Sequence, residues 1–248
     1  MLYLIGLGLS WGDLSMRALE AINQSDEVYL EGYTSVSDWS VDRLKRLIGK
    51  KVEVLDRKQT EEVMPYLKEA HVKDVALLVY GDPLSATTHV EILLEAKKKK
   101  IKTKILHSNS VLTAVAETGL SIYKFGKTAS IPLPEKGFAP SSFYDALKEN
   151  QSIDAHTLFL LDLKPPKTFM TIPQAIKTLL DIAKKRKEQT FTERTFCIGC
   201  ARLGTETQKI KAGTAKILAR ENWGNPPYCL IVPAKLHFKE EEFLRTLK

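Results

Sequence analysis

The stretch LLVYGDPLSATTHVEILLEA, residues 77–96, changes its pattern of apolar and polar residues twice, and this pattern indicates the fold of its part of the chain. An apolar run stops at Gly81-Asp82-Pro83, a turn rich in small and hydroxyl side chains follows, and a segment with helical spacing of apolar residues begins after it. In open α/β sheets, ligands bind at the turns that follow the carboxyl ends of the strands. The stretch therefore predicts a strand, a ligand-facing turn and a helix.

The same alternation of strand and helix extends to both sides of this stretch. The expected strands cover residues 2–9, 27–33, 51–55, 74–81 and 103–108, and the expected helices cover 14–25, 39–48, 60–70, 87–99 and 110–118. Either Asp13 or Ser15 is a suitable N-cap for the first of these helices. Regular alternation of this kind favours a parallel, doubly wound sheet that is covered on both faces.

The composition of the sequence changes at about residue 125, where prolines and glycines accumulate. We place a domain boundary at 124–128, which gives an N-terminal α/β domain over 1–124 and a C-terminal α/β domain over 125–248. In the second domain, the expected strands cover 156–163, 194–203 and 226–236, and the expected helices cover 173–187 and 211–219. Because the alternation is less regular here, the second sheet is expected to be mixed.

The overall composition is that of an ordinary globular protein, with 44% hydrophobic and 27% charged residues in a chain of 248. No apolar run approaches the roughly 18 residues of a membrane helix. The N-terminus lacks the basic and long apolar regions of a signal peptide. Three cysteines make no disulfide framework, which favours a reducing compartment. These features predict a cytoplasmic protein.

Positive charge is concentrated in two runs, Lys97–Lys100 and Lys184–Lys187, within a net charge of +7. Cations are favoured at the carboxyl ends of helices, so solvated helix ends explain both runs. The alternative is an electrostatic surface for an acidic or nucleic-acid-bearing partner. No recognition helix or RNA-binding motif accompanies the runs, and direct binding of nucleic acid is not expected.

Several familiar motifs are incomplete. Gly6-x-Gly8 follows the first strand, but Trp11 stands where a dinucleotide fingerprint has its third glycine, and only Glu31 is available to bind a ribose. The glycines still indicate close backbone approach at the first turn. Cys197-x-x-Cys200 lies inside an apolar run without a second ligand pair, so core cysteines and no metal are expected.

The strand ends share a small, polar and backbone-rich character: GLGLSWGD, YGDPLSATTH, HSNSV, LLDLK, CARLGT and GNPPY. Such loops suit a bulky, mostly uncharged ligand that is held through main-chain groups. A nucleoside-bearing cofactor fits this description better than a phosphate-rich one, because no P-loop is present.

Taken in order, these strand ends resemble those of the tetrapyrrole-methylase-like, class III S-adenosylmethionine-dependent methyltransferases. The strings YGDPLSATTH, TGLSIYKFGKTASIPLPE and NPPYCLIVPAKLH are similar in particular to the diphthine synthase branch of that family, in its compact archaeal form. The resemblance implies two α/β domains, with the cofactor S-adenosylmethionine in the inter-domain cleft, and a homodimer.

Residue by residue, the resemblance implies cofactor contacts from both domains: Leu9, Asp82, Ser85, Ser110, Val111, Leu161, Leu203 and Tyr228. Two positions depart from the family pattern. Tyr228 stands where a histidine is common, and Asn109 stands where a proline is common. Both positions are still able to offer backbone contacts.

The implied reaction is methylation of translation elongation factor 2 on a histidine that already carries a 3-amino-3-carboxypropyl group. Three methyl groups on its amino nitrogen give diphthine, and S-adenosylhomocysteine is the by-product. Because a sulfonium methyl is already activated, alignment does most of the catalytic work, and no nucleophile, metal or general base is assigned. The alternatives are a sibling methyltransferase acting on a tetrapyrrole or another small molecule, and a non-catalytic partner-binding protein of the same fold.

Overall fold

The computed structural model describes residues 1–33, 40–134, 140–164 and 168–247 of the chain. It divides into two compact units, Met1–Leu112 with Gly204–Glu206, and Thr113–Leu203 with Thr207–Lys248. No helix in the described ranges is long and apolar enough to cross a membrane.

This division falls 12 residues before the sequence-based boundary (124 − 112). The segment between the two points packs with the second unit, because the Ser121 backbone N–H donates a hydrogen bond to Glu240 and Lys124 forms an ion pair with the same carboxylate. These contacts join residues that are far apart in the sequence, so the local change in composition does not reveal them.

The first unit is built on a parallel sheet with strand order β3-β2-β4-β1-β5. Its strands are β1 (Leu2–Gly6), β2 (Glu27–Glu31), β3 (Glu53–Leu55), β4 (Val75–Val79) and β5 (Thr103–Leu106). All five expected strands are present, and the predicted parallel sheet is confirmed. Because the strands are parallel, the loops after β1, β4 and β5 leave from one edge.

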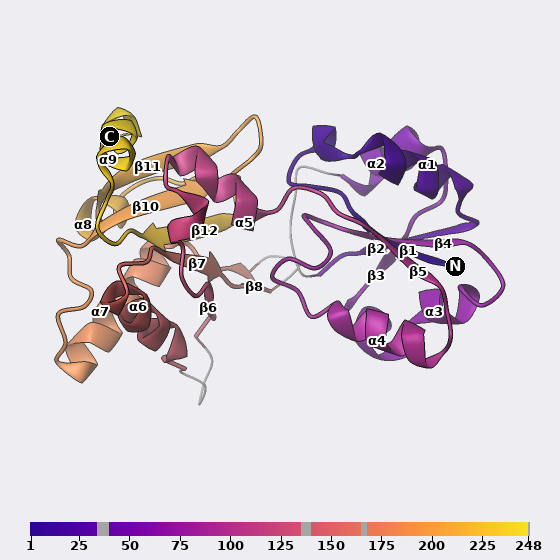
Figure 1. Cartoon of the computed structure of the whole chain (residues 1–248), viewed down its shortest axis with the longest axis horizontal. Coiled ribbons are helices and arrows are strands. Elements are labelled where there is room, and N and C mark those ends of the chain that lie inside the picture. The colour runs from indigo at the N-terminus through magenta and orange to yellow at the C-terminus, as the bar shows by residue number, and fades with distance from the viewer. Residues whose placement is uncertain (34–39, 135–139, 165–167, 248) are drawn as a thin grey trace. The chain divides into compact units, whose positions relative to one another are not determined.

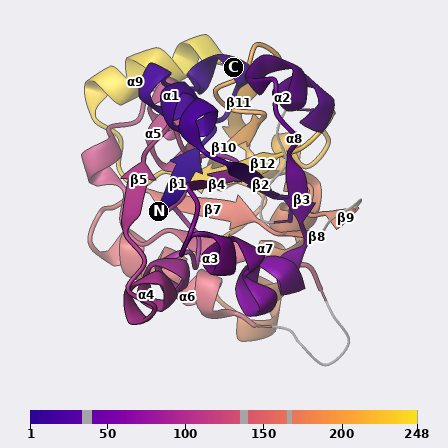
Figure 2. The ribbon, with the colours of Figure 1, turned by 90° about the vertical axis from the view of Figure 1, so that its right-hand side faces the viewer.

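Helices cover both faces of this sheet. Figure 1 shows α1 (Met16–Gln24) and α2 (Val41–Ile48) on one face, and α3 (Pro65–Glu69) and α4 (Val90–Lys98) on the other, and Figure 2 shows the same arrangement from the side. Alternate residues of β1 reach opposite cores: Tyr3 and Ile5 pack in the cluster that contains α1 and α2 residues, whereas Leu2 and Leu4 pack with those of α3 and α4.

Local signals in the sequence explain where the first helices begin and end. The Ser15 hydroxyl accepts the Ala18 backbone N–H at 3.1 Å, which confirms Ser15 as the cap of α1. The helix α2 ends at Gly49, which takes a left-handed φ of 63°. Shorter helical turns are η1 (Trp11–Asp13), the π turn η2 (Gln59–Val63), and α5 (Val111–Ala114) at the division between the units.

The second unit contains a mixed sheet with strand order β11-β10-β12-β7-β6, as the irregular alternation predicted. Among the named strands of this sheet, β6 and β7 pair in parallel, and the other neighbouring strands pair antiparallel. The strands are β6 (Ala129–Ile131), β7 (Thr157–Leu161), β10 (Phe196–Ala201), β11 (Lys209–Thr214) and β12 (Tyr228–Val232), and β8 (Leu163–Lys164) pairs with β9 (Thr168–Phe169).

The core of the second unit lies between its sheet and the helices α6 (Ser142–Ser152), α7 (Ile172–Arg186) and α8 (Ala215–Leu218). Figure 1 shows α6 and α7 on the same face of this sheet. Cys197, Cys200 and Cys229 are all buried, so the interpretation of the Cys-x-x-Cys pair as core residues is confirmed. The turns η3 (Val115–Thr118) and η4 (Ile122–Lys124) stand at the start of this unit, and α9 (Phe238–Leu244) and η5 (Arg245–Leu247) are its last described elements.

Candidate functional site

The loops after β1 and β4 are tied together by two glycines. The Gly8 backbone N–H donates to the Gly81 carbonyl at 3.1 Å, and the Gly81 N–H donates back to the Gly8 carbonyl at 2.9 Å. Both residues have positive φ angles, 76° and 74°. Side chains are strained in that conformation, so this junction between the two loops favours glycine at both positions.

Gly6 allows the ends of three strands to approach one another. A Cβ atom at this position would lie 2.6 Å from the Gly81 carbonyl oxygen, 2.9 Å from the Ser108 Cβ and 3.0 Å from the Pro83 Cδ. These separations are shorter than ordinary van der Waals contacts. The glycine-rich start of the chain therefore serves close backbone approach, as the sequence indicated, rather than a dinucleotide fingerprint.

The Asp82 carboxylate holds the loop after β4 against the loop after β5. Its Oδ1 accepts the Leu84 N–H and the Ser85 hydroxyl, both at 3.0 Å. Its Oδ2 accepts the Ser108 N–H at 3.1 Å and lies 2.8 Å from Nδ1 of His107. A carboxylate offers about four acceptor positions, so these contacts occupy most of its capacity.

Burial of Asp82 would by itself raise the pKa of this carboxyl group. The hydrogen bonds from Leu84, His107, Ser108 and Ser85 outweigh that effect and hold the pKa below its usual value. The group is therefore an ionised acceptor in the folded protein near neutral pH. Its role in the structure is to organise the turn.

Asp13 performs the same task for the loop after β1. Its Oδ2 accepts the backbone N–H groups of Leu9 and Ser10 at 2.8 and 3.0 Å. Its carbonyl oxygen accepts the Ser108 hydroxyl at 3.2 Å. The Asp82 carboxylate and the backbone carbonyl of Asp13 thus join three loops at the carboxyl edge of the parallel sheet, and the Asp13 carboxylate orders its own loop.

The five predicted contact residues of the first unit lie on these three loops or, for Val111, at the start of α5 directly after the third loop. Leu9 is on the first, Asp82 and Ser85 are on the second, and Ser110 and Val111 follow β5. Ser110 is buried, and its hydroxyl accepts the Leu112 N–H at 3.2 Å. The structure therefore brings the five to one edge of the sheet.

The three predicted residues of the second unit also share one end of their sheet. Leu161 is the last residue of β7, Tyr228 is the first of the neighbouring antiparallel strand β12, and Leu203 follows β10 by two residues. The register pairs Ala201 with Tyr228, and the Arg202 N–H bonds the Pro227 carbonyl at 2.8 Å.

Tyr228, one of the two departures from the family pattern, has its hydroxyl engaged with the Gly224 carbonyl. Burial raises the pKa of the Tyr228 phenol, and the nearby Arg202 partly offsets that rise. The hydroxyl is therefore a neutral donor within the loop before β12.

Sequence reasoning missed Asp13, His107 and Ser108 as parts of the site. Their contacts join separate loops, and a single sequence gives no direct sign of such pairings. The available signal was their position, because each lies in or next to a small polar strand end. Among the residues that the structure describes, no group of three or more His, Cys, Asp or Glu side chains is arranged to hold a metal ion.

Comparison with known proteins identifies the class of this architecture. The model of the Tetrapyrrole (Corrin/Porphyrin) Methylases matches residues 1–219, so the chain belongs to this methylase family. Within it, the chain belongs with the diphthine synthases, as the relatives described next show.

Diphthine synthase of Methanocaldococcus jannaschii is 40% identical over 253 residues, covering 100% of this chain and 98% of that protein. A protein of Arabidopsis thaliana named "Probable diphthine methyl ester synthase" is 38% identical, with the same coverage of 100% and 98%. A solved structure of diphthine synthase superposes with a TM-score of 0.89 at 38% identity, covering 100% of this chain and 96% of that one. The family resemblance seen in the sequence is confirmed.

Proposed function

We propose that this protein transfers methyl groups from S-adenosylmethionine to the amino nitrogen of the 3-amino-3-carboxypropyl-histidine of translation elongation factor 2, a step of diphthamide biosynthesis. Full-length similarity to diphthine synthases supports the reaction. The proposal includes three transfers, which give diphthine and S-adenosylhomocysteine.

The cofactor contacts that we propose are the eight residues expected from the resemblance: Leu9, Asp82, Ser85, Ser110, Val111, Leu161, Leu203 and Tyr228. The observation that carries the proposal is the joining of three loops by Asp13 and Asp82 at one edge of the parallel sheet. An edge that carries two carboxylates disfavours a polyphosphate and suits a ligand with hydroxyl groups and a cationic sulfonium centre.

The reaction asks little of the protein beyond alignment. S-adenosylmethionine, when bound, supplies an activated methyl group. The chain has to hold the amino nitrogen in line with that group and exclude competing water, and such positioning alone accounts for a large part of a rate enhancement. The ordered loops around Gly8, Gly81 and Asp82 provide a fixed frame for this purpose.

A second candidate is that a carboxylate is methylated in addition to the amine. The plant relative is named for a methyl ester, and its identity to this chain, 38%, is close to the 40% of the Methanocaldococcus protein. Overall identity therefore does not separate an archaeal-type product from the ester. A tetrapyrrole substrate or a partner-binding role without catalysis are the remaining alternatives.

The decisive experiment is incubation with labelled S-adenosylmethionine and elongation factor 2 that bears the aminocarboxypropyl-histidine, followed by peptide mass spectrometry. We expect up to three methyl increments on that histidine. Mild alkali hydrolyses a methyl ester but leaves methylated amines intact, so loss of one methyl after alkali identifies the second candidate. Labelling of a tetrapyrrole instead, or of no substrate, contradicts the proposal.

We also propose that the protein is a homodimer and acts in the cytoplasm, where its substrate is found. Light scattering across a hundredfold range of protein concentration tests the first point. A monomer mass at every concentration would exclude the dimer.

A further inference from the structure

The carbonyl oxygen of Pro83, inside the turn after β4, is held by two side chains from the same loop. The Thr87 hydroxyl donates to it at 2.8 Å, and Nδ1 of His89 lies 2.9 Å away. His89 is only 2% exposed. A buried imidazole thus closes the loop that contains Asp82 and Ser85.

The partner of His89 fixes which ring nitrogen carries the hydrogen. A carbonyl oxygen only accepts, so Nδ1 must donate. The other nitrogen, Nε2, is buried and has no hydrogen-bond partner among the described residues. Nδ1 therefore contributes a directed hydrogen bond, whereas Nε2 contributes none within the described chain.

The loop that His89 closes contains a strained residue. Ala86 has a φ of 57°, a left-handed conformation that is unfavourable for a residue with a Cβ. Strained conformations of this kind persist where surrounding contacts determine them, and they are concentrated at ligand sites. Here the contacts of Asp82 precede Ala86, and those of Thr87 and His89 follow it.

We propose that His89 is a positioning residue for the cofactor, acting through Nδ1. Its hydrogen bond to Pro83 maintains the 82–88 loop against the strain at Ala86, and so keeps Asp82 and Ser85 in the geometry that binds S-adenosylmethionine. This inference rests on the proposed function. Because His89 is only 2% exposed, its role is to act through the loop and not on the reacting atoms.

A matched pair of substitutions distinguishes the role of Nδ1 from that of Nε2. In His89→Asn, the side-chain amide nitrogen takes the place of Nδ1 and is able to donate to Pro83. In His89→Gln, the amide extends to the place of Nε2 and leaves the carbonyl without this donor. Calorimetric titration with S-adenosylmethionine should give an affinity within about twofold of the parent for His89→Asn, and one about 5- to 10-fold weaker for His89→Gln.

Steady-state kinetics distinguish positioning from a general loss of structure. For His89→Gln, we expect the KM for S-adenosylmethionine to rise by a similar factor while kcat changes less than twofold. His71→Gln, at an exposed histidine of the same unit, is the control and should match the parent. If His89→Gln does not fold, Thr87→Val removes the other donor to the same carbonyl and should weaken binding in the same sense.

Equal affinities of the asparagine and glutamine variants would overturn the inference. The same holds if the affinity of both variants falls in proportion to their thermal stability, because His89 would then be only a core residue. A parent protein that binds no S-adenosylmethionine would overturn the proposed function first, and is recognised before any variant is compared.

Discussion

At the scale of single residues, the Asp82 carboxylate has a larger structural role than a ligand contact alone requires. Its side chain is 8% exposed, and it accepts hydrogen bonds from the backbone of both Leu84 and Ser108. Removal of the carboxylate would leave the Leu84 and Ser108 N–H groups without this acceptor. An unsatisfied donor in a largely buried environment typically costs about 1–3 kcal/mol. Loss of cofactor binding and loss of stability are therefore expected together.

We predict that Asp82→Ala lowers the free energy of unfolding by about 2–3 kcal/mol and weakens S-adenosylmethionine binding. Asp82→Asn retains one oxygen acceptor and should lose less of both. Urea unfolding and calorimetric titration provide the two measurements. Asp181→Ala, at an exposed ion pair with Lys177, should change stability by less than about 1 kcal/mol. Parent-like stability and affinity in Asp82→Ala would refute the role.

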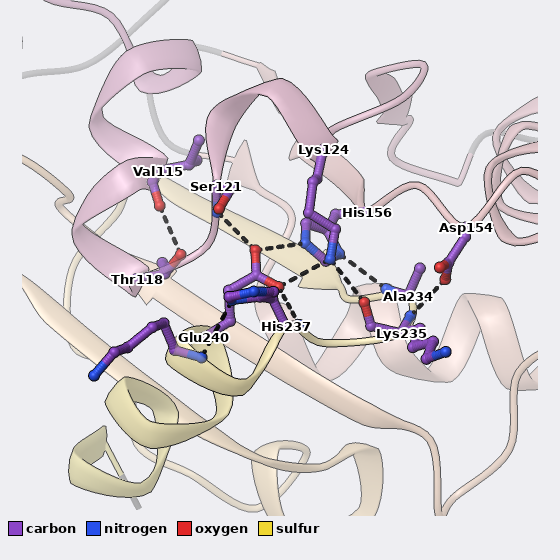
Figure 3. A network of polar contacts seen from close by, with 11 residues as sticks. Val115, Thr118, Ser121, Lys124, Asp154, His156, Ala234, Lys235, His237 and Glu240 are labelled. Carbon is purple, nitrogen blue, oxygen red and sulfur yellow. Dashed lines mark hydrogen bonds and ion pairs between the residues drawn. The ribbon is translucent and has the colours of Figure 1, made fainter.

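A second carboxylate, Glu240, anchors the C-terminal helix of the second unit (Figure 3). It accepts the Ser121 and His237 N–H groups at 2.9 and 2.8 Å and pairs with Lys124 at 2.9 Å. Nδ1 of His156 accepts the Ala234 N–H, so Nε2 carries the hydrogen that faces Glu240, 3.2 Å away. Burial alone would raise the pKa of Glu240, but these contacts lower it to about 2.

This depressed pKa predicts a defined loss of stability in acid. Relative to an unfolded value of 4.5, the shift corresponds to about 3 kcal/mol, which is fully present above pH 4.5 and fades as the pH falls toward 2. We predict that Glu240→Gln is destabilised at pH 7 and that its stability falls less steeply than that of the parent between pH 4.5 and 2. Urea unfolding at several pH values tests this. Parallel curves for the two proteins would contradict it.

At the scale of elements, the site depends on how closely β1 approaches the turn after β4. Gly6→Ala would place a methyl group 2.6 Å from the Gly81 carbonyl and 3.0 Å from Pro83, so the turn would have to move. We predict a loss of about 1–3 kcal/mol in stability and a clear fall in cofactor affinity. Gly12→Ala is the control, because no atom lies within 4 Å of a Cβ placed there. Equal effects of the two substitutions would show that the close approach is unimportant.

Elements were predictable from the sequence where their own residues specify them. The buried parallel strands β1 and β4 are continuous apolar runs, and both were expected. The helix expected over 211–219 is wrong at residues 211–214, which belong to β11, and it contains α8. The pairing of β11 with β10 is a long-range contact that its own residues do not specify. The helix α9 was missed because only Leu244 and Glu240 are buried along it.

In the candidate site, too, the sequence predicts local features but not long-range contacts. The loops that bear Leu9, Asp82 and Ser110 were identified because strand-end composition is local. The pairings that join them, such as Ser108 with Asp13, were not predictable, because they depend on the parallel strand order. The sequence therefore locates the edge of the sheet, and the fold determines which side chains meet there.

At the scale of the whole molecule, the two basic runs lie at the carboxyl ends of α4 and α7, as a helix-end interpretation predicts. The residues of these runs differ in their contacts. Arg186 is tied to Asp145 and Ser141, and Lys98 pairs with Glu95. The other lysines of both runs are exposed. A protein substrate has to be docked as well as bound at its modified histidine, and exposed lysines are suited to that task.

We predict that one of the two runs recruits elongation factor 2. Charge reversal of Lys97, Lys99 and Lys100 is compared with reversal of Lys184, Lys185 and Lys187, which leaves the Arg186 ion pair intact. The run that docks the substrate should, when reversed, lower kcat/KM for the protein about 10-fold at low salt and reduce its salt dependence, because such charges act mainly on association. The affinity for S-adenosylmethionine should stay unchanged in both variants. If neither reversal alters kcat/KM, the runs are solvated helix ends, and recruitment of the substrate depends on other surfaces.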